Sequence, residues 1–415
     1  MTDSHAKLFE PFTLNNGVTL QSRLVIAPLT LYCQNPDGTV SEAERDFISS
    51  RGRNFGMVIH GATLVSDNGQ GFPGQPRAIR DYDLQALKER VRLTHANGSL
   101  AIAQIHHAGI LGNPAFLRDH VPVGPSENEE RGARALMPPE VKAIIRAFAH
   151  AAELCLVAGY DGVEIHGANR YLIQQFYSGA TNHRTDEWGG SNEARMRFPL
   201  AVLDAVLRVK ERSGKKNFII GYRLSPEEPE EVGITMKETL ALIQELIKRD
   251  IQYIHVSEKE FFQNARRGAD ETRSRLDLIH EAIAGKTALI GLGNLFTGDD
   301  FDKAIGTGWV ELAATGRAVM LNPDLATLIR EGRDSEIQTK LDPVKEALTT
   351  ARRCSGPVSR NNSTEFHSKK PGRSTELRAF SSLYRLRESL TARSTRVYYY
   401  RERRKHGLSS SSSGF

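Results

Sequence analysis

Eight short, almost wholly apolar runs alternate along this chain with eight longer stretches that carry apolar residues every three or four positions. Apolar runs without polar alternation are typical of parallel strands buried on both faces. Helices that connect parallel strands cover the sheet, so the pattern indicates an α/β fold. The predicted strands are Leu24–Pro28, Met57–Ala62, Leu100–His106, Gly162–His166, Phe218–Leu224, Tyr253–Ser257, Ala288–Gly291 and Trp309–Ala314.

The stretches between these runs are predicted to be helices, and they match the strands in number. Eight strand–helix units favour a closed (β/α)8 barrel, the TIM barrel. The alternative is an open, doubly wound sheet. It is weakened because no Gly-x-Gly-x-x-Gly follows the first strand, as it would in a dinucleotide-binding unit. The predicted helices are Glu42–Arg53, Tyr82–Ala96, Pro139–Ala158, Glu193–Arg212, Met236–Lys248, Arg273–Ala284, Asp299–Ile305 and Pro323–Arg330.

Three segments depart from the alternation. Within residues 5–23, Asn15-Asn16-Gly17 separates two short apolar runs, which predicts an N-terminal β-hairpin. Residues 107–138 and 167–192 are long connections that follow the third and fourth strands. Connections of this length inside a compact domain are usually functional. Both follow the C-terminal ends of strands, where barrel enzymes hold their active sites.

The net charge of +5 is unevenly distributed along the chain. Residues 351–415 contain 15 basic residues, 4 acidic residues and 14 serines, without sustained apolar periodicity. This composition predicts a disordered, low-complexity basic tail, with a nucleic-acid-binding arm or a docking segment as alternatives. Residues 1–350 carry a net charge of −6 and are predicted to form one domain, the barrel with its hairpin.

The sequence contains no recognisable membrane helix, secretory signal or cysteine cluster, and this limits where the protein is located and whether it binds a metal. No apolar run approaches the roughly 18 residues of a membrane helix, and the first residues do not resemble a secretory signal. Cys33, Cys155 and Cys354 are far apart and odd in number, which argues against a disulfide framework or a metal cluster. We expect a cytoplasmic protein with no membrane partner and no metal. The sequence does not determine the number of subunits, and a homo-oligomer is compatible with it.

Polar residues stand at the ends of seven of the eight predicted strands and are expected to meet at one mouth of the barrel. Two of these ends, Gly291–Asn294 and Ala314–Arg317, combine glycines, backbone N–H groups and the start of a following helix. Helix N-termini favour anions and Arg317 can add a charge-assisted contact, so these segments predict a phosphate site. The alternative is that the glycines serve only tight turns.

Gln104 and Arg223 lie near the ends of apolar strands, where a buried amide or guanidinium needs partners. A planar heteroaromatic ring with carbonyls and ring nitrogens would satisfy both, and a positive charge at the pyrimidine end of a flavin would stabilise its reduced form. Each residue could equally be a satisfied polar group of the core.

His166, Asn169 and Tyr171 form the sharpest cluster, at the end of the fourth strand. His166 and Asn169 can present two hydrogen-bond donors to one carbonyl oxygen and hold developing negative charge there. Tyr171, with an ordinary pKa of about 10, is protonated at neutral pH and could act as a general acid. No carboxylate or cysteine stands near the histidines at metal-ligand spacing.

The segment HGANRYLIQQFYSGATNHRTDEWGGSNEARMRF (166–198) resembles the signature stretch of the Old Yellow Enzyme family of NAD(P)H:flavin oxidoreductases. RLVIAPLT (23–30), IAQIHHAG (102–109), GYRLSP (221–226), GLGNLF (291–296) and TGR (315–317) follow in family order, and the similarity extends from about Leu8 to Pro323. The resemblance implies a single (β/α)8 barrel that binds FMN non-covalently.

The resemblance also implies roles for individual residues. Flavin contacts would come from Ala27, Pro28, Leu29, Thr30, Ala62, Gln104 and Arg223. The FMN phosphate would be held by Gly293, Asn294, Gly316 and Arg317. His166 and Asn169 would bind the substrate carbonyl, Tyr171 would donate a proton, and Tyr32 would line the pocket.

The reaction implied by the resemblance has two halves. NADH or NADPH reduces FMN, and the flavin passes hydride to an electron-poor alkene (an enone) or a related acceptor such as a quinone, with Tyr171 as proton donor. Arg170 replaces a common glycine beside Tyr171 and bears on substrate scope. An alternative is another FMN barrel, such as a tRNA dihydrouridine synthase using the basic tail. Such an enzyme needs a catalytic cysteine in the pocket and a folded basic domain, and the sequence offers neither clearly. A nucleic-acid partner is therefore not expected.

Overall fold

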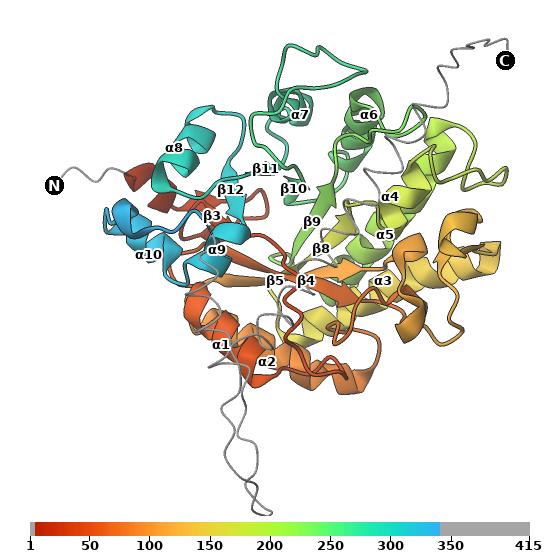
Figure 1. Cartoon of the computed structure of the whole chain (residues 1–415), viewed down its shortest axis with the longest axis horizontal. Coiled ribbons are helices and arrows are strands. Elements are labelled where there is room, and N and C mark those ends of the chain that lie inside the picture. The colour runs from red at the N-terminus through yellow and green to blue at the C-terminus, as the bar shows by residue number, and fades with distance from the viewer. Residues whose placement is uncertain (1–4, 341–415) are drawn as a thin grey trace, which may run out of the picture. The chain divides into compact units, whose positions relative to one another are not determined.

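The computed structural model describes residues 5–340 of the 415-residue chain, and eight parallel strands in it close into a barrel (Figure 1). The predicted (β/α)8 barrel is therefore confirmed. Closure is made between the last strand and the first, with Ala313 paired with Leu24 and Thr315 with Ile26. In order around the barrel the strands are β3 (Leu24–Ile26), β4 (Met57–Leu64), β5 (Leu100–His106), β8 (Gly162–Gly167), β9 (Ile219–Leu224), β10 (Tyr253–Val256), β11 (Ala288–Leu292) and β12 (Leu312–Thr315).

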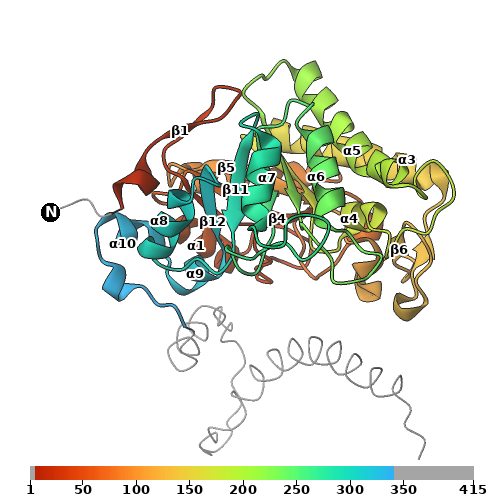
Figure 2. The same cartoon turned by 90° about the horizontal axis from the view of Figure 1, so that it is seen from above.

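Helices alternate with these strands and cover the outside of the barrel (Figures 1 and 2). All eight predicted helices are present with shifted ends. The helix predicted from Tyr82 starts at Leu84, because Asp81–Asp83 forms a separate 3-10 turn. The helices are α1 (Glu42–Arg51), α2 (Leu84–His95), α3 (Pro138–Ala158), α4 (Leu172–Tyr177), α5 (Asn192–Ser213), α6 (Met236–Leu246), α7 (Arg275–Ile283), α8 (Gly298–Gly306), α9 (Arg317–Leu321) and α10 (Leu325–Arg330).

Two of these helices, α4 and α9, were not predicted. All six residues of α4 are buried, so the segment lacks the polar face that reveals an amphipathic helix. The five residues of α9 are too few to show a helical period.

The predicted N-terminal hairpin is confirmed and consists of β1 (Phe12–Thr13) and β2 (Thr19–Leu20). Its Leu14 and Leu20 are buried in the apolar cluster that fills the barrel. Asn15 Nδ2 donates to the carbonyls of Ile251 and Lys286, at 2.9 and 3.0 Å. These residues precede β10 and β11, so the hairpin packs against the N-terminal end of the barrel.

The barrel interior is apolar at its N-terminal end and polar toward its C-terminal end. Val25, Met57, Ile102, Ile219 and Leu312 belong to one buried apolar cluster at the first of these ends. Successive inward positions lie two residues apart on a strand. On that spacing Ile102 is followed by Gln104 and His106, and Ile219 by Gly221 and Arg223. The interior therefore becomes polar toward the mouth at which active sites of this fold lie.

The two long connections that were predicted to be functional meet at this C-terminal end. Residues 107–138 contain the short strands β6 (Val123–Gly124) and β7 (Arg134–Ala135), and residues 167–192 contain α4. Figure 2 shows β6 next to α4, and the two elements are in contact. The connections thus support each other beside the mouth.

The predicted tail, residues 351–415, lies outside the residues that the structure describes, so its separation from the barrel domain stays a prediction. Among the described helices none is long and apolar enough to cross a membrane.

Candidate active site

A pocket opens between the C-terminal ends of β3, β4, β5, β8 and β9. Most of the residues predicted for the flavin and substrate contribute to it, which means that the fold brings together residues up to 195 positions apart in the sequence. The pocket is lined by Pro28, Leu29, Thr30, Gly61, Ala62, Phe72, Gln104, His106, His166, Asn169, Tyr171 and Arg223.

Of the residues predicted to contact the flavin ring or the substrate, two lie outside this lining. Ala27 is buried in the apolar barrel interior, one residue below Pro28. Tyr32 is 69% exposed and packs edge-on against Phe72, with ring centroids 5.6 Å apart. Tyr32 therefore stands at the rim of the pocket.

His166 is the penultimate residue of β8, and its surroundings determine its protonation. Burial lowers the pKa of His166 well below 6.5, and the neighbouring His106, Arg223 and His255 lower it further. The imidazole is therefore neutral at physiological pH. Its Nδ1 accepts a hydrogen bond from the backbone N–H of Ala168 at 3.3 Å, so the ring proton lies on Nε2. His166 thus has one N–H available as a donor.

Asn169 is held from two sides. Its backbone is left-handed, with φ of +57°, and its backbone N–H donates to Ser225 Oγ at 2.8 Å. Its side-chain Oδ1 accepts a hydrogen bond from Ser257 Oγ at 2.8 Å. Since Oδ1 is engaged, the Nδ2 group is the part of the amide left to donate. Asn169 and His166 therefore each offer an N–H group at the same pocket.

Tyr171 packs within a group of three rings at the pocket. Its ring centroid lies 4.3 Å from that of His106 and 5.1 Å from that of His166, both in edge-on arrangements. Burial raises the pKa of Tyr171, and the neighbouring Tyr32 raises it further. The phenol therefore keeps its proton at neutral pH, as a general acid must.

The turn that carries Asn169 and Tyr171 is fastened by its neighbours. The backbone N–H of Arg170 donates to Gln174 Oε1 at 2.8 Å, and the Arg170 guanidinium pairs with Glu230 in the connection after β9. Gln174 Nε2 in turn donates to the buried Glu228 at 2.7 Å. The α4 helix, which no sequence pattern predicted, therefore anchors the turn that carries Asn169 and Tyr171.

Gln104 and Arg223 form the inner wall of the pocket. Gln104 is 2% exposed, and its Nε2 donates to Glu164 Oε1 at 2.7 Å. Arg223 is 6% exposed, and its buried Nε has no hydrogen-bond partner among the described residues. A buried guanidinium with an unmatched N–H is a site for an acceptor that a ligand could supply.

The four residues predicted for the phosphate lie together beside the pocket. Arg317 Nη2 donates to Asn294 Oδ1 at 2.9 Å, which joins the ends of β12 and β11. A Cβ added at Gly316 would come within 2.8 Å of Leu29, a lining residue of the pocket. Gly293 has φ of +148°, and a Cβ there would overlap the backbone of Phe261. The close backbone approach at position 293 thus requires glycine.

One element of the phosphate prediction is missing. The helix after β11, α8, begins at Gly298, four residues beyond Asn294. Its first N–H groups are engaged within the protein, since Gly298 donates to Asp334 and Asp300 donates to Thr297. The N-terminus of α8 therefore offers these N–H groups to no anion. The other helix, α9, begins at Arg317 directly after Gly316.

His106 and Phe72 also line the pocket, although neither was predicted as a site residue. His106 ends β5 and was visible as a polar residue at a strand end. Burial lowers its pKa to about 3, with a further contribution from His107, so this ring is also neutral. Phe72 comes from the connection after β4, and no sequence pattern marks it.

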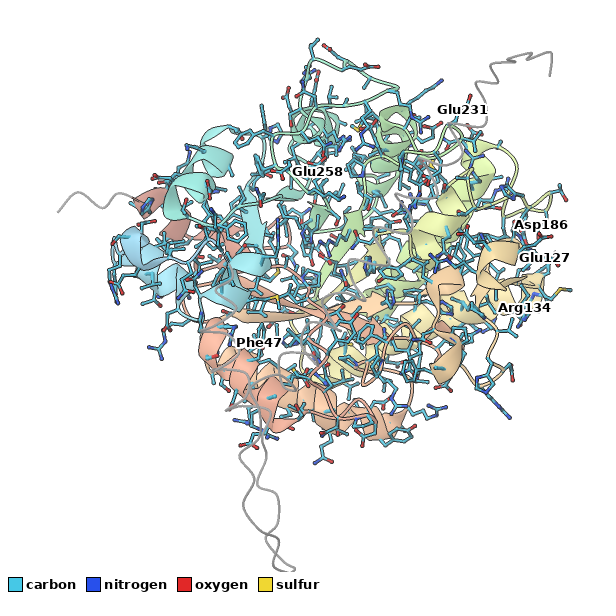
Figure 3. The ribbon with its side chains drawn as sticks, viewed as in Figure 1. Phe47, Glu127, Arg134, Asp186, Glu231 and Glu258 are labelled. Carbon is cyan, nitrogen blue, oxygen red and sulfur yellow. The ribbon has the colours of Figure 1, made fainter. Side chains whose placement is uncertain are left out.

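A second cavity lies outside the barrel wall, between β3, β4 and α1. It is lined by Phe47, which Figure 3 labels on α1, and by the buried Glu44 and Arg90. These two charges are paired with each other through two hydrogen bonds of 2.8 Å. Glu44 and Arg90 thus satisfy each other and leave no unpaired charge between them for a ligand. Within residues 5–340 no group of three or more His, Cys, Asp or Glu side chains could hold a metal ion.

Known proteins match this chain over most of its described length. The profile of the NADH:flavin oxidoreductase / NADH oxidase family matches residues 7–336. A probable NADH-dependent flavin oxidoreductase of Bacillus subtilis (strain 168), YqiG, is 44% identical over 342 residues, which are 82% of this chain and 92% of the relative. The 12-oxophytodienoate reductase 2 of Arabidopsis thaliana is 34% identical over 348 residues, covering 78% of this chain and 90% of the relative.

Other relatives are much longer than the matched region. The NADH:fumarate oxidoreductase of Klebsiella pneumoniae (strain 342) is 36% identical over 345 residues, which are 80% of this chain and 37% of that protein. Among solved structures, morphinone reductase superposes with a TM-score of 0.69 and 27% identity, covering 83% of this chain and 94% of that one.

Proposed function

Because the chain belongs to the NADH:flavin oxidoreductase / NADH oxidase family, we propose that it binds FMN at the barrel mouth and uses NADH to reduce α,β-unsaturated carbonyl compounds. The kinship with Old Yellow Enzyme that the sequence predicted is confirmed. The protein is a flavin-dependent oxidoreductase. The observation that carries the proposed substrate class is the convergence of two N–H donors and a protonated phenol in one pocket.

The inner wall of the pocket fits a flavin. The pyrimidine edge of the flavin ring carries two carbonyl oxygens and one N–H group. The unpartnered Nε of Arg223 supplies a donor with positive charge, and the Gln104 amide supplies a further hydrogen-bonding group. Pro28, Leu29 and Ala62 provide apolar surface for the ring. These residues would hold the ring of FMN, and Arg223 would favour negative charge at its pyrimidine end.

The corner between β11 and β12 fits the phosphate end of the same group. Arg317 supplies positive charge, and its bond to Asn294 keeps the guanidinium at the ends of both strands. Gly316 lies against Leu29, so this corner adjoins the proposed ring site. In barrels of this type a phosphate site commonly lies after the last two strands.

Bound FMN would supply hydride transfer, which couples oxidation of a nicotinamide to reduction of an alkene. His166 Nε2–H and Asn169 Nδ2–H would both donate to the carbonyl oxygen of the substrate. Two such donors draw electron density from the conjugated double bond and stabilise the negative charge that develops on the oxygen. They thereby make the β-carbon of the substrate electron-poor and fix its orientation.

Tyr171 would complete the reduction by donating its phenolic proton to the α-carbon of the substrate. Its raised pKa keeps the proton in place until negative charge develops on that carbon. His106 packs edge-on against the Tyr171 ring and limits its movement. Because His106 is neutral, it adds no charge that would ionise the phenol early.

NADH is the proposed reductant, and the relatives support this choice by their names. The Arg170 guanidinium beside the pocket is already paired with Glu230, so it offers no free charge to the 2′-phosphate of NADPH. The Klebsiella relative acts on fumarate, but only 37% of it is matched. We therefore propose enones and quinones as acceptors rather than fumarate. We also propose a cytoplasmic location, where reduced nicotinamide is available.

The alternative of a tRNA dihydrouridine synthase has no support among the relatives described above. The residues that converge on the pocket are those expected for carbonyl activation. Cys33, the cysteine closest in sequence to the pocket residues Pro28–Thr30, is not among the residues that line it.

The visible absorption spectrum tests the proposed function. The purified protein should be yellow, or become so with added FMN, and anaerobic NADH should bleach it. Cyclohexenone or a quinone should then restore the oxidised spectrum, and NADPH should bleach the protein more slowly than NADH. A protein that cannot take up FMN would refute the proposal, and bleaching without reoxidation by any enone would refute the substrate class.

A further inference from the structure

Glu164 is a buried acid for which the function above provides no role. It lies in the middle of β8 with a side chain that is 0% exposed, between the apolar floor of the barrel and the polar mouth. Its Oε1 accepts a hydrogen bond from Gln104 Nε2 at 2.7 Å, and its Oε2 lies 2.8 Å from His255 Nδ1. Isolated buried charges are costly, so a carboxylate in a barrel core calls for an explanation.

The surroundings of Glu164 keep it ionised. Burial raises its pKa, but the positive charge of Arg223 and the hydrogen bonds from His255 and Gln104 outweigh burial and hold the pKa below its ordinary value. Arg223 lies on the adjacent strand β9, two residues beyond Gly221, which is the register partner of Glu164. Tyr253 fills the space beside Gly221, where a side chain would overlap its ring. The acid is thus enclosed by groups that stabilise its charge.

An ionised carboxylate accepts hydrogen bonds and cannot donate them. The group of Gln104 that faces Glu164 must therefore be its NH2 group, which leaves the Gln104 carbonyl oxygen for the pocket. We propose that Glu164 is a positioning residue that orients Gln104 to accept a hydrogen bond from the flavin N3–H and partly offsets the charge of Arg223. Gln104 touches the ligand, and Glu164 acts through it.

The second part of the role concerns charge. Arg223 favours the reduced, anionic form of a flavin whose pyrimidine end lies beside it. Glu164 carries the opposite charge one strand away, and it weakens this effect. Removing the negative charge while keeping the shape of the side chain should therefore make the flavin easier to reduce. It should also weaken FMN binding. A glutamine at position 164 can present either its oxygen or its NH2 group to Gln104, so the orientation of Gln104 is no longer fixed.

The test uses the Glu164→Gln variant of the full chain loaded with FMN. We expect the midpoint potential of the flavin to shift to more positive values and the dissociation constant for FMN to rise on the order of tenfold. The inference rests on the proposed function, and the two fail differently. If the wild type binds no FMN, the proposed function fails. If it binds FMN and Glu164→Gln leaves both quantities unchanged, only the role of Glu164 fails.

Glu228→Gln is a matched control. Glu228 is another buried acid, 4% exposed, that accepts a hydrogen bond from a glutamine amide, Gln174 Nε2, at 2.7 Å. It does not line the pocket. We expect this variant to lose stability while leaving the flavin potential and the FMN dissociation constant as in the wild type. Equal shifts in both variants would overturn the role of Glu164.

If Glu164→Gln does not fold, Glu164→Asp retains the charge and shortens the side chain. The proton resonance of N3–H in bound, 15N-labelled FMN then gives the decisive reading. It should show a strong hydrogen bond in the wild type and a weaker one in Glu164→Asp, with little change in potential. A wild-type resonance like that of free FMN, or identical resonances in both proteins, would overturn the inference.

Discussion

Ser257 donates its hydroxyl hydrogen to Oδ1 of Asn169 over 2.8 Å, although the two residues are 88 positions apart in the chain. Ser257 directly follows β10, and Asn169 lies in the turn after β8. The bond occupies the acceptor end of the Asn169 amide and leaves its donor end for the pocket. It connects the substrate-binding turn to a barrel strand that lies two places away.

Ser257→Ala should therefore weaken binding of carbonyl substrates. Loss of one hydrogen bond lets the Asn169 amide rotate, and we expect KM for an enone to rise about three- to tenfold with a smaller change in kcat. Titration with a phenol, followed by the flavin absorption spectrum, should show the same loss. Ser257→Thr, which keeps the hydroxyl, should behave like the wild type. Unchanged phenol affinity in Ser257→Ala would contradict this role.

Tyr171→Phe should separate the two half-reactions. Removal of the phenolic proton should slow alkene reduction by about 10²- to 10⁴-fold, the usual contribution of a general acid. Reduction of the flavin by NADH needs no proton from Tyr171 and should change by less than about twofold. Stopped-flow measurement of each half-reaction checks this. Equal losses in both would show that Tyr171 acts on the site as a whole.

Arg90→Leu should destabilise the fold strongly. Arg90 and Glu44 are 1% and 3% exposed and joined by two hydrogen bonds, so the substitution leaves a buried carboxylate without its partner. We expect a loss of about 3–5 kcal/mol in the free energy of unfolding, measured with urea. The control is Arg45→Ala, which breaks the partly exposed pair with Glu89 and should cost no more than about 1 kcal/mol. Similar losses in the two variants would show that burial of the ion pair does not determine the loss in the free energy of unfolding.

His5 should make stability depend on pH. Burial lowers the pKa of His5, but hydrogen bonds and charges from Asp302 and Asp334 outweigh burial and raise the pKa above 6.5. The folded protein therefore binds this proton more tightly than the unfolded chain. The resulting stability is fully present below about pH 6.5 and is lost as the pH rises through the raised pKa of the folded state.

The measurement is the difference in the free energy of unfolding between the wild type and His5→Gln. We expect it to be larger at about pH 5.5 than at about pH 8.5. Taking the difference removes the contributions of other histidines, such as His107, whose pKa burial lowers to about 3. A difference that stays constant or grows with pH would contradict the assignment.

Deletion of residues 351–415 should leave the bound flavin spectrum and the turnover with NADH and an enone unchanged. The residues that line the pocket and the corner between β11 and β12 all precede position 318. The same samples, tested for RNA binding, would show whether the basic segment has the alternative role considered above. Loss of flavin from the truncated protein would mean that the segment supports the barrel.

Much of the barrel could be predicted because each strand carries its own signal. β5 and β8 are buried on both faces, so their sequences are mostly apolar. The polar residues Gln104 and His166 near their C-terminal ends were therefore easy to recognise. The hairpin was visible in Asn15-Asn16-Gly17 for the same local reason. By contrast, α4 is buried on all sides and has no polar face, so no pattern revealed the helix that fastens the Arg170 turn.

The order of strands and helices, the polar residues at the strand ends and the family could be predicted from the sequence alone. Each predicted strand, helix and motif is recognisable from residues within one short segment. The tertiary structure decided which of those ends share a pocket, and it placed Phe72 in the lining and Tyr32 at the rim. It also decided that Glu164 faces Gln104 and that Ser257 reaches Asn169. These contacts depend on strand register and on closure of the barrel, which join residues that no local pattern relates.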